Sequence, residues 1–297
     1  MDFSSEKRCF LCPRGCAVDR TETAGACGMT SVLTVSRAAP HMWEEPPISG
    51  TQGSGTIFFA GCSLRCVFCQ NREISHGRQG RAVGEDELCN LMLKLQDEGV
   101  HNINLVTPTH YADALSRVLT AVKPRLHIPV VWNSSGYETP DTLGRLQGLV
   151  DIYLPDFKYA SEELAARYSA APDYPDVAAS ALSEMYRQVG PVAFDGEGMM
   201  QRGMIVRHLV LPGHRDDSMA VMRRIAEILP AEHIRISVMR QYTPDFAMDT
   251  PYKNLHRRVT DFEYASVVAE AERLGLEGYM QGKDAADRAY TPDFAAH

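Results

Sequence analysis

The chain has 297 residues, a net charge of −8 and a pI of about 5.7, with 44% hydrophobic and 23% charged residues. This composition is typical of a globular protein with enough apolar content for a full core. The acidic balance excludes a global basic field for nucleic-acid phosphates. No apolar run is long enough for a membrane span, and Met1 to Lys7 lack the apolar stretch of a signal peptide. We therefore expect a cytoplasmic protein that binds neither nucleic acid nor membrane.

Four cysteines near the start of the chain are spaced as a complete set of metal ligands. Cys9, Cys12, Cys16 and Cys27 form the pattern C-x2-C-x3-C-x10-C. Four thiolates satisfy either a structural zinc ion or an auxiliary iron–sulfur cluster, and both alternatives stay open. We assign residues 1–55 to a Cys-rich N-terminal extension, and we expect its last part, from Pro40 onward, to be an irregular connection because of its prolines and glycines.

A second group of three cysteines follows a short apolar run, Thr56–Ala60. Cys62, Cys66 and Cys69 form C-x3-C-x2-C, with Phe68 before the last cysteine. Disulfide pairing would leave one cysteine over, and a structural zinc site normally takes four ligands. Three thiolates on one tight loop instead suit a cubane iron–sulfur cluster whose fourth iron has no protein ligand. Such an iron is open to a substrate or cofactor. Metal-type spacing also fits a reducing compartment better than a disulfide framework.

From residue 56 onward, strand-like apolar runs alternate with helical stripes, which is typical of parallel βα units. The expected strands are Thr56–Ala60, Asn102–Val106, Ile128–Trp132, Val150–Asp156, Met204–Leu211 and Ile234–Met239. Six units favour an α/β fold of the partial (β/α)6 TIM-like barrel type over a doubly wound sheet. We assign this barrel to residues 56–297, with an insertion at about 161–202 and a C-terminal tail. Insertions of this length are usually lids or surface packing.

Polar residues follow the carboxyl ends of successive strands, where barrel enzymes place their active sites. They are Thr107, Thr109 and His110 after the second strand, Asn133 and Ser134 after the third, Asp156 and Lys158 after the fourth, and Gln241 after the sixth. Lys158 is a candidate partner for a carboxylate, and Asp156 for hydroxyl or ammonium groups; an ordinary ion pair between them is the alternative. Arg207 and His208 lie within the fifth strand, as candidates for substrate contact or for a buried polar network.

These motifs resemble the PflX-type radical S-adenosylmethionine (SAM) proteins, relatives of pyruvate formate-lyase activating enzymes. The resemblance covers nearly the whole chain, including both cysteine groups and the segments around Thr107, Asp156 and Arg207. It implies a [4Fe–4S] cluster and SAM. The implied cofactor contacts are Phe68, Thr107, Thr109, Asn133, Ser134, Asp156 and Lys158. Many members have Gly-Gly-Glu after the second strand, whereas Thr107-Pro108-Thr109 stands here without a carboxylate.

The resemblance implies reductive cleavage of SAM and hydrogen abstraction from a substrate that the sequence does not identify. One alternative is a small molecule or peptide, with His110, Arg207, His208 and Gln241 as candidate contacts. Another is activation of a glycyl-radical partner protein, and a third is a non-catalytic iron–sulfur electron-transfer module. We favour the first, because the insertion and the repeated Tyr-Thr-Pro-Asp-Phe at residues 290–294 can cover the barrel mouth.

Basic residues near the second cysteine group predict the electron donor. These are Arg65, Arg72, His76, Arg78 and Arg81, a local patch on an acidic chain. A solvated loop is the alternative interpretation. Complementary charge speeds the encounter of proteins, so the patch favours an acidic flavodoxin or ferredoxin as reductant.

Overall fold

The computed structural model describes residues 8–282, 285 and 294. The parallel strands are β2 (Ser54–Phe59), β4 (Ile103–Val106), β5 (Val130–Ser134), β6 (Ile152–Pro155), β8 (Met200–Leu209), β9 (Arg235–Met239) and β10 (Gly278–Met280). The antiparallel strands are β1 (Thr34–His41), β3 (Arg81–Ala82) and β7 (Ala193–Phe194). The sheet order is β10-β9-β8-β6-β5-β4-β2-β1-β3, with β7 paired to β8. All six predicted strands are present in this sheet.

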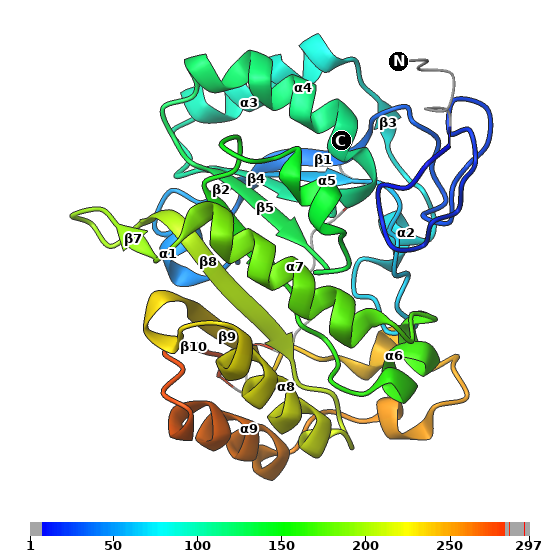
Figure 1. Ribbon diagram of the computed structural model, residues 1–297, viewed down its shortest axis with the longest axis vertical. Helices are drawn as coiled ribbons and strands as arrows, with labels where there is room; N and C mark the ends of the chain where they lie inside the picture. Colours follow the sequence, from blue (N-terminus) through cyan, green and yellow to red (C-terminus); the bar gives the residue numbers. More distant parts are fainter. Residues whose placement is uncertain (1–7, 283–284, 286–293, 295–297) are drawn as a thin grey trace.

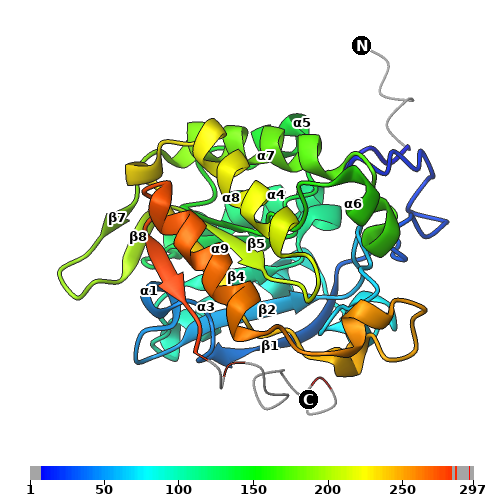
Figure 2. The ribbon, with the colours of Figure 1, turned by 90° about the horizontal axis from the view of Figure 1, so that it is seen from below.

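The sheet stays open, since β10 and β3 are its two ends. The helices that connect or flank its strands are α1 (Pro46–Ser49), α2 (Arg72–Ser75), α3 (Glu85–Asp97), α4 (Ala112–Val122), α5 (Pro140–Gly144), α6 (Glu162–Ser169), α7 (Tyr174–Val189), α8 (Arg215–Ile228) and α9 (Asp261–Arg273). Figure 1 shows α7 crossing in front of β8, and Figure 2 shows the same layering from below. The predicted α/β fold with a mostly parallel sheet is therefore confirmed.

Local sequence signals set the helix boundaries. The Thr139 hydroxyl accepts a hydrogen bond from the backbone of Thr142, and Pro140 takes the first position of α5. Thr260 and Glu263 form the capping box expected at the start of α9. In the described part of the chain, no helix has both the length and the apolar character needed to cross a membrane.

The insertion at residues 161–202 is not a lid. It folds into α6, α7 and the hairpin of β7 with β8. Ala178, Leu182 and Met185 are fully buried along one stripe of α7, which packs against β6 and β8. An amphipathic stripe of this kind needs a sheet to cover it, so α7 lies on the outside of the sheet as the crossover from β6 to β8.

The prediction of an irregular connection before residue 56 is also wrong in part. Pro40 belongs to β1, and α1 and the start of β2 follow it. The proline is tolerated because β1 pairs with β3 only through Thr34 and Val35, so the rest of β1 is an edge on that side. Residues 34–41 thus form part of the sheet.

Candidate functional site

A cavity of about 630 Å³ lies where the carboxyl ends of the parallel strands face the second cysteine loop. Its lining includes Cys62, Cys66, Phe68, Cys69, Thr107, Asn133, Ser134, Asp156, Lys158, Arg207 and Gln241. This volume is in the usual range for a small-molecule or cofactor site. The structure therefore brings together most of the residues that the sequence predicted.

The cysteine loop is held in a tight turn after β2. Gly61 has φ of +84°, and a Cβ there would lie 2.2 Å from Cγ of Met29, so only glycine fits. The amide of Cys69 donates to the carbonyl of Cys66 at 3.1 Å. Phe68 packs edge-on against Tyr168 and against Tyr242. These contacts fix the direction in which the three sulfur atoms point.

The chemistry of the three thiols fits a cationic cluster. Burial, and then the neighbouring sulfur charges of Cys66 and Cys62, raise the pKa of Cys69 to about 12. Burial also raises the pKa of Cys62. Raised pKa values keep the thiols of Cys62 and Cys69 neutral unless a metal centre or another cation compensates the thiolate charge. Two hydroxyls already face sulfur atoms, Ser75 with Cys69 at 3.3 Å and Ser169 with Cys66 at 3.0 Å.

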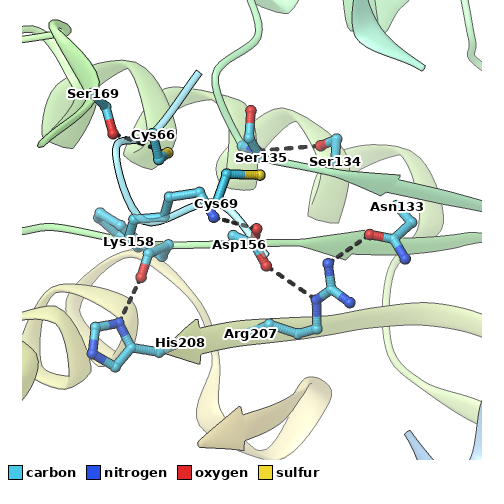
Figure 3. A network of polar contacts seen from close by, with 12 residues as sticks. Cys66, Cys69, Asn133, Ser134, Ser135, Asp156, Lys158, Ser169, Arg207 and His208 are labelled. Carbon is cyan, nitrogen blue, oxygen red and sulfur yellow. Dashed lines mark hydrogen bonds and ion pairs between the residues drawn. The ribbon is translucent and has the colours of Figure 1, made fainter. Parts of the chain in front are cut away.

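Asp156, Lys158, Arg207 and Asn133 form one polar network on the cavity wall (Figure 3). Lys158 Nζ lies 2.6 Å from Asp156 Oδ2, and Arg207 Nε lies 3.1 Å from Asp156 Oδ1. Burial alone would raise the pKa of Asp156, but the charges of Lys158 and Arg207 hold it below its usual value. Arg207 also donates to Asn133 Oδ1 at 2.5 Å. The Asp156–Lys158 ion pair is thus formed, and both residues still line the cavity.

Thr107 occupies a strained position at the end of β4. Its φ is +57°, which is costly for a β-branched residue, by roughly 1–3 kcal/mol. Its amide donates to the Asn133 carbonyl at 2.9 Å, which anchors the turn to the next strand. In this conformation Thr107 lines the cavity, at a turn position that glycine would adopt without strain.

Thr109, His110 and His208 are not among the residues that line the cavity. His110 Nε2 lies 2.8 Å from the Ala60 carbonyl, and burial followed by the charge of Arg20 lowers its pKa to about 3. His208 Nδ1 lies 2.7 Å from the Phe157 carbonyl. Neighbouring residues of a strand point to opposite faces, so His208 turns away from the cavity when Arg207 points into it.

Three glutamates at or beside the cavity are not among the residues that the sequence predicts: Glu44 and Glu45 line it, and the buried Glu138 supports Ser134, which lines it. Glu138 accepts hydrogen bonds from the Thr109 hydroxyl at 2.9 Å, the Trp132 indole at 2.6 Å and the Ser134 hydroxyl at 2.6 Å. Glu44 and Glu45 line the cavity from the segment between β1 and α1. The signal in the sequence is the pair of adjacent carboxylates before two prolines, but a segment predicted to be an irregular connection does not place them in a cavity.

The N-terminal cysteines lie near one another in a looped segment. A Cβ atom added at Gly25 would lie 3.3 Å from the Cys16 sulfur and 3.6 Å from the Cys27 sulfur, so both sulfur atoms lie close to this glycine. Burial, together with the charges of the neighbouring sulfurs, raises the pKa of Cys12 to about 12. Over residues 8–282, 285 and 294, no three His, Cys, Asp or Glu side chains are arranged around a single ion position.

Arg14 connects this N-terminal segment to the cavity loop. Its Nε donates to the Ser63 carbonyl at 2.8 Å and its Nη2 to the Ser169 carbonyl at 2.6 Å. The Cys62 amide also donates to the Cys27 carbonyl at 3.2 Å. Figure 1 shows the looped segment, in dark blue, beside α2 and α6. The two cysteine groups are therefore structural neighbours.

Comparisons with known proteins identify one matching family and several similar proteins. A sequence model of the radical SAM superfamily matches residues 56–245. MJ0674, an uncharacterized protein of Methanocaldococcus jannaschii, is 29% identical over 282 residues, which cover 91% of this chain and 76% of that protein.

Solved structures share the fold at low sequence identity. SuiB of Streptococcus suis bound to the precursor peptide SuiA has a TM-score of 0.51 and 14% identity, covering 74% of this chain and 46% of SuiB. SuiB bound to SAM has a TM-score of 0.50 and 16% identity over 74% of this chain and 48% of SuiB. A radical SAM methyltransferase from Sphaerobacter thermophilus has a TM-score of 0.50 and 13% identity, over 76% of this chain and 66% of that protein. The chain spans less than half of SuiB, and these identities show the fold alone.

Proposed function

Because this chain belongs to the radical SAM superfamily, whose sequence model matches residues 56–245, we propose that it cleaves SAM reductively and abstracts hydrogen from a small-molecule or peptide substrate. Membership implies a [4Fe–4S] cluster and SAM as cofactors. The observation that carries the proposal is the convergence of three thiols and the polar strand ends on one cavity. An electron-transfer module needs no cavity of this size beside its cluster.

The residues present fit both cofactors. Cys62, Cys66 and Cys69 would hold three irons of the cluster. When bound, the reduced cluster supplies the electron that divides SAM into methionine and a 5′-deoxyadenosyl radical, the species that takes hydrogen from the substrate. Lys158 would pair with the carboxylate of SAM. Asp156 would orient the ammonium group of Lys158 through the ion pair between the two residues. In place of the missing Gly-Gly-Glu carboxylate, backbone carbonyls and the Thr107 hydroxyl would accept hydrogen bonds from the amino group of SAM.

The test is a SAM-cleavage assay. Anaerobically reconstituted protein with dithionite and SAM should form 5′-deoxyadenosine and methionine, measured by mass spectrometry. Cys66→Ala should abolish the products, since one iron loses its ligand. Cys89→Ala is the matched control, because Cys89 lies on α3 and its sulfur faces the Val118 carbonyl. Equal product from the Cys66 variant and the parent would refute the proposal.

Activation of a glycyl-radical partner is the second candidate. An activating enzyme must admit a peptide loop, and the insertion leaves the mouth uncovered because α6 and α7 do not line the cavity. SuiB was solved bound to a precursor peptide, so a protein of the same fold binds a peptide. The experiment mixes the enzyme with candidate glycyl-radical proteins under reducing conditions. A glycine-centred doublet in the electron paramagnetic resonance spectrum, dependent on enzyme and SAM, would establish this function.

An acidic flavodoxin or ferredoxin is the proposed reductant. Arg65, Arg72, Arg78 and Arg81 are exposed around the cysteine loop, although Arg72 pairs with Asp249 at 3.2 Å and Arg81 pairs with Glu87. Charge reversal at Arg78 and Arg81 should slow turnover driven by flavodoxin and spare turnover driven by dithionite. Equal slowing of both would exclude docking at this patch.

A further inference from the structure

One arginine side chain of the N-terminal segment holds the cysteine loop to α6. The Arg14 guanidinium donates to the Ser63 carbonyl at 2.8 Å and to the Leu64 carbonyl at 3.5 Å, and both carbonyls lie between the first two cysteines of the loop. It also donates to the carbonyls of Ser169, at 2.6 Å, and Ala170, at the end of α6. A guanidinium presents its N–H donors in a rigid fork, so this side chain fixes the two segments relative to each other.

The α6 end of this connection reaches a sulfur atom of the loop. The carbonyl of Ser169 accepts from Arg14, and the hydroxyl of the same residue lies 3.0 Å from the Cys66 sulfur. A displacement of Arg14 would therefore disturb both the backbone of the loop and the hydrogen-bond partner of Cys66. Arg14 is not among the residues that line the cavity, so any effect on the site passes through the loop.

The backbone of Arg14 is part of the N-terminal cysteine segment. The Gly15 amide donates to the Cys12 carbonyl at 3.0 Å, which closes a turn that contains Arg14. Cys16 follows this turn directly, and Cys9 stands three residues before Cys12. A metal held by these thiols would fix the turn and, with it, the direction of the Arg14 side chain.

Cys27, the last of the N-terminal cysteines, contacts the cysteine loop through its backbone. Its carbonyl accepts a hydrogen bond from the Cys62 amide at 3.2 Å. A Cβ atom added at Gly61 would lie 2.9 Å from the same carbonyl oxygen, so the two segments are in direct contact. The N-terminal segment thus holds the cysteine loop both at Cys62 and at the residues that follow it.

We propose that Arg14 is a positioning residue for the cysteine loop, and that a metal held by the N-terminal cysteines strengthens cluster binding at the loop through it. This inference rests on the proposed function and on metal binding by the N-terminal cysteines, and it adds a coupling between the two sites. Coupling of this kind is reciprocal, so each metal centre raises the affinity of the other site by the same factor, typically about 5- to 150-fold.

The first experiment tests the positioning role in protein without a cluster. The rate at which N-ethylmaleimide alkylates Cys66 in iron-free protein is measured by mass spectrometry, with Cys89 on α3 as the internal reference for folding. Arg14→Met should raise the rate at Cys66 at least about fivefold and leave the rate at Cys89 unchanged. Arg14→Lys keeps the charge and some donors, so it should restore part of the protection. Arg8→Met is the matched control, because Arg8 is exposed on the same segment.

The second experiment tests the coupling to the N-terminal cysteines. The cluster at the loop is followed by the part of the electron paramagnetic resonance signal of the reduced protein that changes when SAM is added. During incubation with an iron chelator, Cys12→Ala and Arg14→Met should each speed the loss of this signal at least about fivefold. The double variant should lose it no faster than the faster single variant, because both substitutions act through one connection.

Three outcomes overturn the inference. Alkylation of Cys66 at the parent rate in the Arg14→Met protein removes the positioning role. Loss of the signal at the parent rate in the Cys12→Ala protein removes the coupling, and so do effects of the two substitutions that add. A parent protein that cleaves SAM and gives one of these results refutes this inference alone. Faster alkylation of Cys66 in a protein that does not cleave SAM refutes the proposed function but keeps the positioning role, since alkylation requires neither cluster nor SAM.

Discussion

The hydroxyl of Ser169 lies 3.0 Å from the sulfur of Cys66, although 103 residues separate them in the chain. Ser169 is the last residue of α6, within the insertion. The insertion thus reaches the cysteine loop through a hydrogen bond to the sulfur of Cys66, which we propose as a cluster ligand. Hydrogen bonds to ligand sulfurs are among the factors that set the reduction potential of an iron–sulfur cluster.

Ser169→Ala should lower the reduction potential of the cluster. The lost hydrogen bond stabilises negative charge on the sulfur, and this charge is greater in the reduced state. A redox titration followed by electron paramagnetic resonance measures the change. Ser183→Ala is the matched control, because the Ser183 hydroxyl donates to the Ala179 carbonyl within α7. An unchanged potential in the Ser169 variant would remove the hydrogen bond from the set of tuning factors.

Lys158→Met should weaken SAM binding by roughly tenfold or more, the typical effect of losing a charged hydrogen-bond donor. Asp156 keeps Arg207 as a partner in this variant, so the network loses one cation only. Equilibrium dialysis of SAM against the cluster-loaded protein measures the affinity. Lys94→Met, on the exposed face of α3, is the control. Parent-like affinity would mean that Lys158 serves the ion pair alone.

The N-terminal cysteines should form a metal site of their own. A protein with Cys62, Cys66 and Cys69 all changed to Ala should retain metal, and a further change at Cys12 should release it. Elemental analysis distinguishes the two alternatives, since iron with sulfide indicates an auxiliary cluster and zinc a structural site. A metal-free triple variant would contradict both.

Glu263→Gln should destabilise the protein at neutral pH by about 2 kcal/mol of unfolding free energy, because the charge-assisted contacts with Arg257 and with the Gly213 amide are lost or weakened, whereas Gln can still complete the capping box. The Arg257 guanidinium, then the Thr260 and Gly213 amides, hold the pKa of Glu263 far below its usual value. A depressed pKa stabilises the folded state fully above the unfolded pKa of about 4.3, and this contribution is lost as the pH falls further. Urea unfolding at pH 7 and pH 3.5 should therefore show a smaller difference at the lower pH.

Glu272→Gln on the same helix is the control for this measurement, since Glu272 is exposed. A difference between the parent and the Glu263 variant that is independent of pH would mean that the side chain acts through its shape and not through its charge.

The sequence predicted six of the seven parallel strands, because each of the six contains a short apolar run bounded by turn residues. It also predicted the cavity wall, since parallel strands deliver their carboxyl ends to one place. It did not predict β1, whose residues Thr34–His41 include Arg37 and Pro40 and show no strict alternation. β10 has only three residues, too few for a pattern.

The two glutamates that the sequence did not place in the site, Glu44 and Glu45, lie in the segment after the missed strand β1. Glu44 and Glu45 reach the cavity only because β1 pairs with β2 and ends beside Ser54. No local pattern encodes this pairing. The prediction that His110 contacts the substrate did not anticipate where its side chain lies, for a different reason. The 3-10 turn over Thr109–Tyr111 directs its ring to the Ala60 carbonyl, and the position after a strand does not specify that direction.

The cysteine loop takes its final shape late in folding, because Arg14 joins it to distant segments of the chain. Arg14 joins the Ser63 carbonyl, 49 residues away, to the Ser169 carbonyl, 155 residues away. Contacts between such distant segments form only after long stretches of chain have been ordered. During synthesis the loop can take its final shape only once α6 has left the ribosome and docked. A cluster held by Cys62, Cys66 and Cys69, as we propose, would therefore meet the finished loop only after the chain has been translated as far as Ser169.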